Sequence, residues 1–169
     1  MKSTTNLNMR IKITKNIFLK EVVLNDVDYI LKLRTDKILS KFINPTSKKK
    51  IDQINWLRKY FIRKKKKKEY YFIFQTKNKN KFKSHGFARI IHLKNKLFHF
   101  GGWVLNKNID PGISLETCFS IYKYAFINLN YKSCLLWINL KNKKVIRFHK
   151  NLGAKYVKKD KKEIFLRFN

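Results

Sequence analysis

Residues 103–154 read WVLNKNIDPGISLETCFSIYKYAFINLNYKSCLLWINLKNKKVIRFHKNLGA, and this stretch decides the fold. It predicts a strand that turns through Pro111-Gly112 into a helix over 113–129, where apolar residues recur at helical spacing. A strand over 133–140 and a helix over 142–152 follow. Backbone N–H groups stay unpaired in the first turn of a helix, and the helix dipole favours an anion there. The glycine turn therefore predicts a place for a phosphate.

The same patterns, followed outward to both ends of the chain, predict a mixed sheet with helices on both faces. Runs of apolar and aromatic residues predict strands over 17–23, 69–76, 86–93, 97–105, 155–158 and 163–168. Helical spacing predicts two further helices, over about 27–33 and 50–62, and a polar hairpin loop is expected over 77–83. The resulting order is β, α, α, β, β, β, α, β, α, β, β. It predicts an α/β fold of the mixed α+β type, with six to seven mostly antiparallel strands and about four helices.

Length and composition favour a single domain over 17–169 that follows a polar N-terminal extension over 1–16. The chain has 169 residues, 44% of them hydrophobic, which is enough to form a substantial core. No apolar run is long enough to span a bilayer, and residues 1–10 lack the apolar centre of a secretory signal, so a cytoplasmic protein is expected.

Cys118 and Cys134 lie in apolar segments outside any CxxC pair. This favours two reduced, buried thiols over a disulfide or a metal site.

The formal charge of +31, from 41 Lys and Arg against 10 Asp and Glu, leaves two interpretations open. A nucleic-acid-binding protein could have this composition. However, the lysines are spread over the whole chain together with many Asn, Ile, Phe and Tyr residues, a joint bias that an AT-rich coding sequence produces. The dense basic block over 63–68 separates a predicted helix from a strand and is expected to be a solvated loop. The scarcity of acids is less easily explained by codon bias, and a basic surface would attract anionic ligands.

The order of elements and two local motifs resemble the GNAT N-acetyltransferase superfamily over residues 17–168. In that family a strand is followed by a turn of pattern Gln/Arg-x-x-Gly-x-Gly/Ala, whose amides hold the diphosphate of CoA. Here Gly112 and Ser114 fit the pattern, whereas Ile109 stands where a polar or basic residue is expected. The resemblance implies acetyl-CoA as the co-substrate, held in part by Gly112, Ile113 and Ser114. Lys107 could supply the missing charge.

The late helix carries the second match to the family. The family's helix often begins with Asn, reaches Leu-Tyr and closes with Gly-Phe, and this chain has Asn142, Phe148-His149 and Gly153-Ala154 at those places. The resemblance implies that Asn142 and Phe148 contact the CoA arm. It also implies that His149 stands where many members place the tyrosine that protonates the leaving thiolate, a role that imidazole can fill near neutral pH. An exposed helix histidine without a catalytic role is the alternative.

One branch of the family is especially similar. Its features include the strings FHFGGWVL over 98–105 and PGISLE over 111–116, and LRTD over 33–36 followed by QINWL over 53–57. Members of that branch acetylate an amino group on a nucleotide-linked sugar in surface-polysaccharide and nonulosonic-acid pathways. The ribosomal-protein acetyltransferases share much of the same pattern. A small-molecule amino sugar is therefore the expected acceptor, and a protein amine is the alternative.

The family's fourth strand presents backbone N–H groups to the thioester carbonyl and the CoA arm. The resemblance assigns this part to Trp103, Val104 and Leu105. The neighbouring pair Gly101-Gly102 is expected either to form a bulge or merely to kink the strand. Because side chains alternate along a strand, His99, Gly101 and Trp103 are expected to share one face. His99 could act there as the base, or it could be an ordinary half-buried residue.

Four further side chains are candidates for the acceptor side. Glu116 lies in the first turn of a predicted helix, where it could serve the helix dipole or act as a base or amine-binding group. Arg34 and Arg89 could meet an acceptor diphosphate or be surface charges. Trp56, like Trp103, could stack on a uracil or sugar face, although core packing is the commoner role of tryptophan.

The expected reaction is direct attack of the acceptor amine on acetyl-CoA in a ternary complex. No cysteine is placed as a nucleophile and no metal-ligand spacing occurs, so no covalent intermediate and no metal are expected. Whether the protein is a monomer or a homodimer stays open.

The competing class is a non-catalytic RNA- or ribosome-binding protein that uses its charge and its aromatic residues. No RNA-binding signature is present and the aromatic residues fall at core periodicity, so nucleic acid is not expected as a partner.

Overall fold

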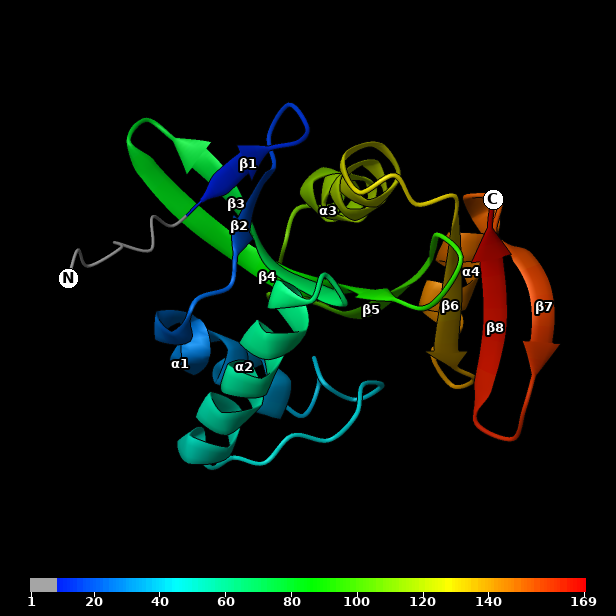
Figure 1. Ribbon diagram of the computed structural model, residues 1–169, viewed down its shortest axis with the longest axis horizontal. Helices are drawn as coiled ribbons and strands as arrows, with labels where there is room; N and C mark the ends of the chain where they lie inside the picture. Colours follow the sequence, from blue (N-terminus) through cyan, green and yellow to red (C-terminus); the bar gives the residue numbers. More distant parts are fainter. Residues whose placement is uncertain (1–8) are drawn as a thin grey trace.

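A computed structural model describes residues 9–169, and within them the chain forms an eight-stranded sheet of order β1-β2-β3-β4-β5-β6-β8-β7 (Figure 1). The strands are β1 (Arg10–Lys12), β2 (Phe18–Glu21), β3 (Glu69–Asn78), β4 (Lys81–His92), β5 (Leu97–Leu105), β6 (Ser133–Asn139), β7 (Lys155–Lys159) and β8 (Glu163–Phe168). Neighbouring strands pair antiparallel except β5 and β6, which pair in parallel. The predicted mixed, mostly antiparallel α/β fold is confirmed.

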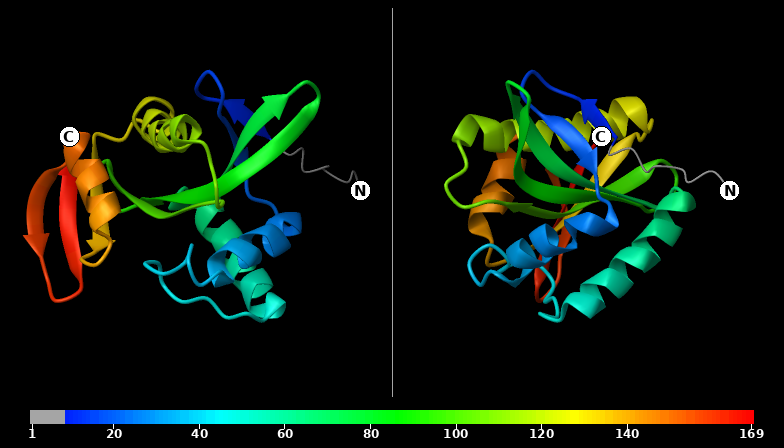
Figure 2. Two further views of the ribbon diagram at one scale, coloured as in Figure 1. Left: turned by 180° about the vertical axis from the view of Figure 1, so that it is seen from behind. Right: turned by 90° about the vertical axis from the view of Figure 1, so that its left-hand side faces the viewer.

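Four α-helices and two short helical turns connect these strands within the described residues. They are α1 (Val27–Thr35), α2 (Lys50–Lys65), α3 (Pro111–Lys123), α4 (Lys143–Asn151), the 3-10 turn η1 (Leu24–Asp26) and the π-helical turn η2 (Tyr124–Asn128). α1 and α2 cover one face of the sheet, whereas α3 and η2 cover the other (Figure 2). The predicted helices on both faces are therefore present.

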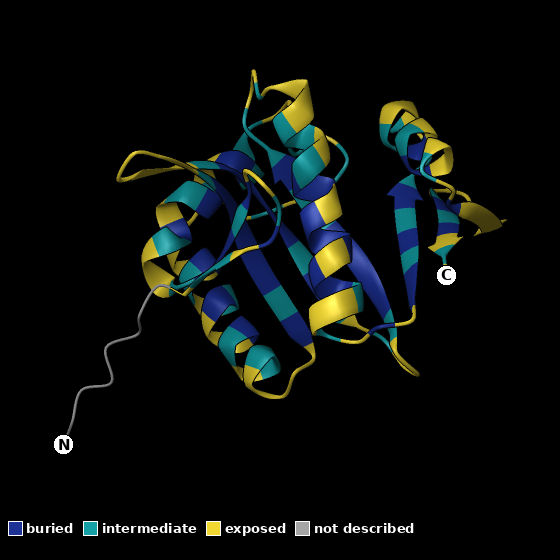
Figure 3. Ribbon diagram, turned by 90° about the horizontal axis from the view of Figure 1, so that it is seen from above, coloured by how far each residue is buried: buried dark blue, intermediate teal, exposed yellow. Residues whose placement is uncertain are grey.

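Two apolar clusters on opposite faces of the sheet account for this layering. In β3, Tyr71 and Ile73 pack toward α1 and α2, and Phe72 and Phe74 pack toward α3 and η2. The strand is buried on both faces, so it reads in the sequence as a continuous apolar run. Figure 3 shows the same layering, with buried residues along the strands and exposed residues on the outer sides of the helices.

Two segments differ from the sequence-based expectation. The first segment is 1–16, which was expected to be a polar N-terminal extension. Its residues 10–12 form β1, which pairs with β2, and Ile13 is buried in the core. Residues 1–8 lie outside the described part. A strand of three residues is too short to show a periodicity. The prediction of a loop over 77–83 is wrong. β3 extends to Asn78 and β4 begins at Lys81, so only a tight turn at Lys79-Asn80 separates them. That ribbon is polar because it projects into solvent.

A bulge in β5 confirms one interpretation of the glycine pair and corrects another. Phe87 pairs with Val104 and Arg89 pairs with Gly101, so Gly102 and Trp103 together oppose one residue of β4. Gly102 has φ 59°, in the left-handed region that glycine adopts without strain. The extra residue reverses the alternation and turns Trp103 toward the α3 cluster. The expectation that Trp103 shares a face with His99 and Gly101 is therefore wrong.

β5 and β6 separate soon after they meet. They pair only over Leu97–His99 and Ser133–Leu135. Further along, β5 follows β4 and β6 follows β8, so the two halves of the sheet splay apart (Figure 1). The backbone edge of β5 from residue 100 onward therefore faces β6 without strand hydrogen bonds. This edge is the structural basis of the candidate site.

Three other findings concern the cysteines, membrane spans and metal sites. Cys118 and Cys134 are buried and free, as predicted. Along residues 9–169, no helix combines the length and the apolar character that a membrane crossing requires. No group of three or more His, Cys, Asp or Glu side chains in this part of the chain is arranged to hold a metal ion.

Candidate functional site

A cavity of about 150 Å³ opens where β5 and β6 diverge, and we call it the splay cavity. It is lined by Arg34, Phe42, Ile43, Asn44, Arg89, His99, Phe100, Gly101, Gly102, Trp103, Leu136, Trp137, Ile138, Asn139, Asn142, Val145, His149 and Glu163. Six residues predicted from the sequence meet there: Arg34, Arg89, His99, Trp103, Asn142 and His149. They come from α1, β4, β5 and the start and interior of α4. Only the tertiary fold brings them together.

His99 lies at the last residue pair that joins β5 to β6. Its Nδ1 is 3.0 Å from the carbonyl oxygen of Leu135, and its ring stacks on Trp137 at a centroid distance of 3.2 Å. Burial lowers the pKa of His99 to about 3, so the ring is neutral near pH 7. In the neutral ring, Nδ1–H donates to the carbonyl, and Nε2 is left as an acceptor beside Gly101. His99 can thus accept a hydrogen bond in the cavity, but it is a weak base.

His149 is enclosed by aromatic rings on the inner side of α4. It is 2% exposed, so the alternative of an exposed helix histidine is wrong. Its Nδ1 is 3.1 Å from the hydroxyl of Tyr122, and its ring contacts Phe100 and Trp103. Burial lowers the pKa of His149 to about 4. Near neutral pH the ring therefore offers one N–H and is not an imidazolium.

Trp137 stacks on His99, and Tyr122 hydrogen-bonds His149. Neither aromatic residue was predicted from the sequence to belong to the site. Trp137 follows Leu135 by two positions on β6, so alternation places both on the face opposite the α3 cluster. Tyr122 lies among the core residues of α3, where helical spacing does not distinguish it from its neighbours. Only the contacts across the sheet show their relation to the site.

The lowered pKa values of the buried histidines predict a loss of stability in acid. His149 takes up a proton near pH 6.5 when unfolded but only near pH 4 when folded, so the unfolded state binds more protons between these values. The free energy of unfolding should fall by about 2 kcal/mol from this residue between pH 7 and about pH 4.5. Urea unfolding at both values measures the loss. Over the same pH range, the free energy of unfolding of a His149→Phe variant should fall by less than that of the wild type. An equal fall in the two proteins would contradict the lowered pKa of His149.

The N-terminus of α3 is partly occupied by its own cap. The carboxylate of Asp110 accepts the N–H of Ile113 at 3.0 Å, and its carbonyl oxygen accepts the N–H of Ser114 at 2.8 Å. Pro111 has no N–H. The N–H of Gly112 makes no hydrogen bond to any described residue. An anion at this turn would meet one open amide and the charge of Asp110.

Positive charge surrounds the same turn. Lys107 pairs with Asp36 at 2.7 Å but is about half exposed (54%), so its ammonium group can change partner. This contact also holds the pKa of Asp36 at about 2. A second cavity of about 680 Å³ adjoins the turn. Its lining includes Lys12, Lys15, Lys77, Lys83 and Lys107. The local potential therefore favours an anion despite Asp110.

Of the cofactor residues predicted on β5, Trp103 packs its side chain away from the open edge. The indole N–H of Trp103 donates to Thr117 Oγ1 at 3.1 Å, and the ring packs against Phe148 at 5.6 Å. Val104 is buried under α1 and α2, and Leu105 packs at the edge of the α3 cluster. Val104 pairs with Phe87, and the next hydrogen bond on this side runs from Asn106 to His85, so the backbone groups of Val104 face β4. Of the three residues, only Trp103 and Leu105 can turn backbone groups away from β4.

Glu116 does not line the splay cavity. Its carboxylate accepts hydrogen bonds from Thr14 Oγ1 at 2.6 Å and from Asn16 Nδ2 at 2.5 Å. These bonds lower the pKa of Glu116. They fasten the turn between β1 and β2 to α3. The structure therefore separates Glu116 from the other predicted catalytic residues.

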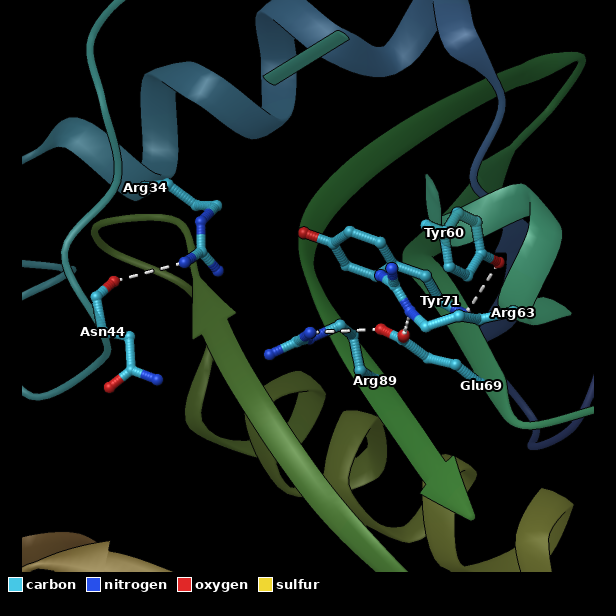
Figure 4. Close-up of polar contacts among 7 residues, drawn as sticks. All are labelled: Arg34, Asn44, Tyr60, Arg63, Glu69, Tyr71 and Arg89. Carbon is cyan, nitrogen blue, oxygen red and sulfur yellow. Dashed lines mark hydrogen bonds and ion pairs between the residues drawn. The ribbon is translucent and has the colours of Figure 1, made fainter. Parts of the chain in front are cut away.

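Arg34 and Arg89 both line the splay cavity, and Figure 4 shows their side chains approaching each other from α1 and β4. Arg34 donates to Thr46 Oγ1 at 2.6 Å and to the carbonyl of Asn44 at 3.2 Å. Arg89 pairs with Glu69 at 3.1 Å and lies over the ring of Trp56 at 5.3 Å. Both arginines line the cavity and are partly buried. The Trp56 ring supports Arg89 and does not line the splay cavity.

Comparison with known proteins agrees with this geometry. Residues 16–155 match the sequence profile described as acetyltransferase (GNAT) domain. No curated protein sequence matches the chain. Among solved structures, apo FdhC, described as a nucleotide-linked sugar GNAT, is similar with 26% identity and a TM-score of 0.82; the match covers 96% of this chain and 90% of FdhC.

Two more distant structures share the fold and contain coenzyme A. Spermidine N-acetyltransferase from Vibrio cholerae, with CoA and spermine, is 13% identical with a TM-score of 0.74, over 92% of this chain and 96% of that one. RimL, a ribosomal L7/L12 alpha-N-protein acetyltransferase with CoA, is 10% identical with a TM-score of 0.78, over 95% of this chain and 97% of that one.

Proposed function

The chain belongs to the GNAT acetyltransferase family, and on that basis we propose that it transfers the acetyl group of acetyl-CoA to an amino group on a nucleotide-linked sugar in surface-polysaccharide biosynthesis. The observation that carries the proposal is the splay cavity, which joins the open edge of β5 to a wall of two arginines. The similarity to a nucleotide-linked sugar GNAT over 96% of the chain supports the acceptor class. A protein amine is the alternative acceptor.

In this proposal the acetyl-CoA arm lies along the open edge of β5. Backbone groups of Trp103 and Leu105 would bond its amides, because β6 does not pair with this part of β5. Val104 lies between them with its backbone groups turned to β4. The diphosphate would lie at the turn of Gly112, Ile113 and Ser114. Asn142 and Phe148 would border the arm from α4, and Lys107 would approach from the turn. The CoA in two structures of the same fold supports acetyl-CoA as the co-substrate.

The reaction needs a neutral amine and a stabilised leaving group. His99 Nε2 can accept a hydrogen bond from the attacking amine and orient its lone pair. The new N–C bond forms as the C–S bond breaks, and the proton that the amine loses ends on the sulfur of CoA. His149 is neutral, so its N–H hydrogen-bonds the sulfur as negative charge develops rather than delivering a proton from an imidazolium.

Asp110 is expected to weaken the binding of CoA that this proposal requires. Asp110→Asn removes the negative charge beside the diphosphate but keeps a good helix cap, so stability should change little. The Kd for CoA, measured by isothermal titration calorimetry, should fall by about threefold to fivefold, which corresponds to the usual energy of one charge at a helix end. Asp160→Asn removes a charge that caps the turn between β7 and β8 and is the matched control. Weaker binding by Asp110→Asn alone would contradict the placement.

A direct test combines binding with turnover. Thermal shift with acetyl-CoA and CoA should show stabilisation, and a thiol-release assay should show turnover with amino-sugar nucleotides. Turnover only with a peptide amine would move the acceptor to the protein class. Absence of CoA binding, together with nucleic-acid binding that weakens steeply with salt, would support the non-catalytic alternative instead.

A further inference from the structure

Arg34 and Arg89 line two adjoining cavities. One is the splay cavity; the other, of about 340 Å³, lies between the loop after α1 and the start of α2 and includes Trp56 in its lining. The two cavities share Arg34, Asn44 and Arg89. A ligand can therefore extend from one cavity to the other past both guanidinium groups.

A third polar group lies beside the two arginines. Tyr71 is 1% exposed, and its hydroxyl lies close enough to the Arg34 guanidinium group for each to shift the pKa of the other, but it completes no well-formed hydrogen bond to any described residue. In Figure 4 this hydroxyl points away from the Glu69 cluster and toward the side of Arg34. Tyr60, by contrast, uses its hydroxyl to accept the backbone N–H of Tyr71 at 3.0 Å. A buried hydroxyl without a partner lowers stability, so its retention in this place points to a ligand.

The charges in this region are incompletely balanced. Glu69 is shared by Arg63 and Arg89, and Arg89 Nε is buried without a hydrogen-bond partner among the described residues. Arg34 bonds only to neutral oxygens. Asp52 is exposed at the rim of the outer cavity, and no ion pair within the described residues includes it. Burial lowers the pKa of Arg34, and the nearby charge of Arg89 acts in the same direction.

The β5 bulge helps to place Arg89. A Cβ on Gly102 would lie 3.3 Å from Arg89 Nε, so glycine at this position leaves room for the guanidinium group against the strand. Trp56 supports Arg89 at 5.3 Å. The guanidinium group is therefore positioned before any ligand arrives, which reduces the entropy lost on binding.

We propose that Arg34, Arg89 and Tyr71 form a binding site for the diphosphate of the acceptor, an inference that deepens the proposed function and rests on it. Two guanidinium groups and a phenol O–H offer donors to phosphate oxygens. A diphosphate held there directs the attached sugar into the splay cavity, toward His99. Amine acceptors without an anionic group lose this contact, so the site selects nucleotide-linked sugars over protein amines.

The binding experiment uses inorganic pyrophosphate and UDP as probes, titrated calorimetrically into protein saturated with CoA. Saturation removes competition at the α3 turn. Wild-type protein should bind both probes, and Arg34→Gln and Tyr71→Phe should each weaken binding by about tenfold, as expected for a lost charge-assisted hydrogen bond. Arg58→Gln removes an equal charge from the exposed side of α2, where Arg58 contacts only Asn55 among the described residues, and should change nothing.

Tyr71→Phe separates a binding role from a structural one. Because the hydroxyl completes no well-formed hydrogen bond in the free protein and has only the Arg34 guanidinium group nearby, its removal should leave the melting temperature nearly unchanged. A lower melting temperature with unchanged pyrophosphate affinity would show that the hydroxyl is structural and would overturn the proposal. Unchanged affinity in both Arg34→Gln and Tyr71→Phe would also overturn it.

A kinetic arm separates this inference from the proposed function. The ratio of kcat/KM for an amino-sugar nucleotide to that for the same free amino sugar should exceed ten in the wild type and fall toward one in Arg34→Gln. If the wild type acetylates both acceptors equally, the phosphate site is wrong although the transferase proposal stands. If no amine is acetylated, the transferase proposal fails, and the pyrophosphate titration without CoA still decides whether the three residues bind phosphate.

Discussion

Replacement of His149 by Phe is expected to lower kcat by about 100-fold while the Kd for CoA stays nearly unchanged. Phenylalanine keeps the contacts of the ring with Phe100 and Trp103 but removes the N–H that would meet the departing sulfur. It also leaves the Tyr122 hydroxyl unpaired, which should reduce the free energy of unfolding by about 1–3 kcal/mol. Steady-state kinetics and calorimetry with CoA separate the two effects.

Two further variants control for stability. His149→Phe combined with Tyr122→Phe should recover stability, because both partners of the hydrogen bond are then apolar, without recovering kcat. His149→Tyr supplies a phenol O–H donor, the group that the resemblance to the family implies at this place, and should recover most of the rate that His149→Phe loses. Full turnover in His149→Phe would remove His149 from the reaction and leave it a packing residue.

Gly101→Ala should be the most damaging single-methyl addition in the site. A Cβ at this position would lie 2.5 Å from Nε2 of His99, and the ring is held by the Leu135 carbonyl and by Trp137. The ring must therefore move, the strand must bend, or both. We expect a loss of about 1–3 kcal/mol of stability from overpacking. kcat/KM should fall by at least about tenfold, because shifts at the reacting centre of about 1 Å are costly.

A double-mutant cycle tests the cause of this loss. In His99→Ala, the alanine at position 101 meets empty space, so Gly101→Ala should then cost much less stability than it does in the wild type. Denaturant unfolding of the four proteins gives the coupling energy. Equal losses in the two backgrounds would show that the clash with His99 is not the reason.

The sequence was sufficient for the parts of the fold that depend on neighbouring residues. Helical spacing and apolar runs predicted every helix and all strands except β1, whose three residues are too few to show a period. The Gly101-Gly102 pair left a bulge and a kink open, and the structure shows the bulge, with Gly102 at positive φ. Local reasoning failed where the bulge reversed the alternation, because one extra residue moves every later side chain to the other face.

The candidate site followed from the sequence only in part. The resemblance to the family pointed to Asn142 and His149, strand alternation pointed to His99, and all three line the splay cavity. It did not indicate that Asp110 would occupy an amide of the turn at α3, although an acid before Pro-Gly is a recognisable cap. Tyr71 gave no sequence signal, because an aromatic residue in a buried strand reads as core.

The sequence by itself determined the α-helices, every strand except β1, their order and the excess of positive charge, since each depends on residues close in the chain or on composition. Tertiary structure decided the rest. The separation of β5 from β6 makes the cavity, and packing across the sheet brings Arg34 and Arg89 to it from distant segments. The neutral state of His99 and His149 arises from burial, which depends on contacts that no local pattern encodes.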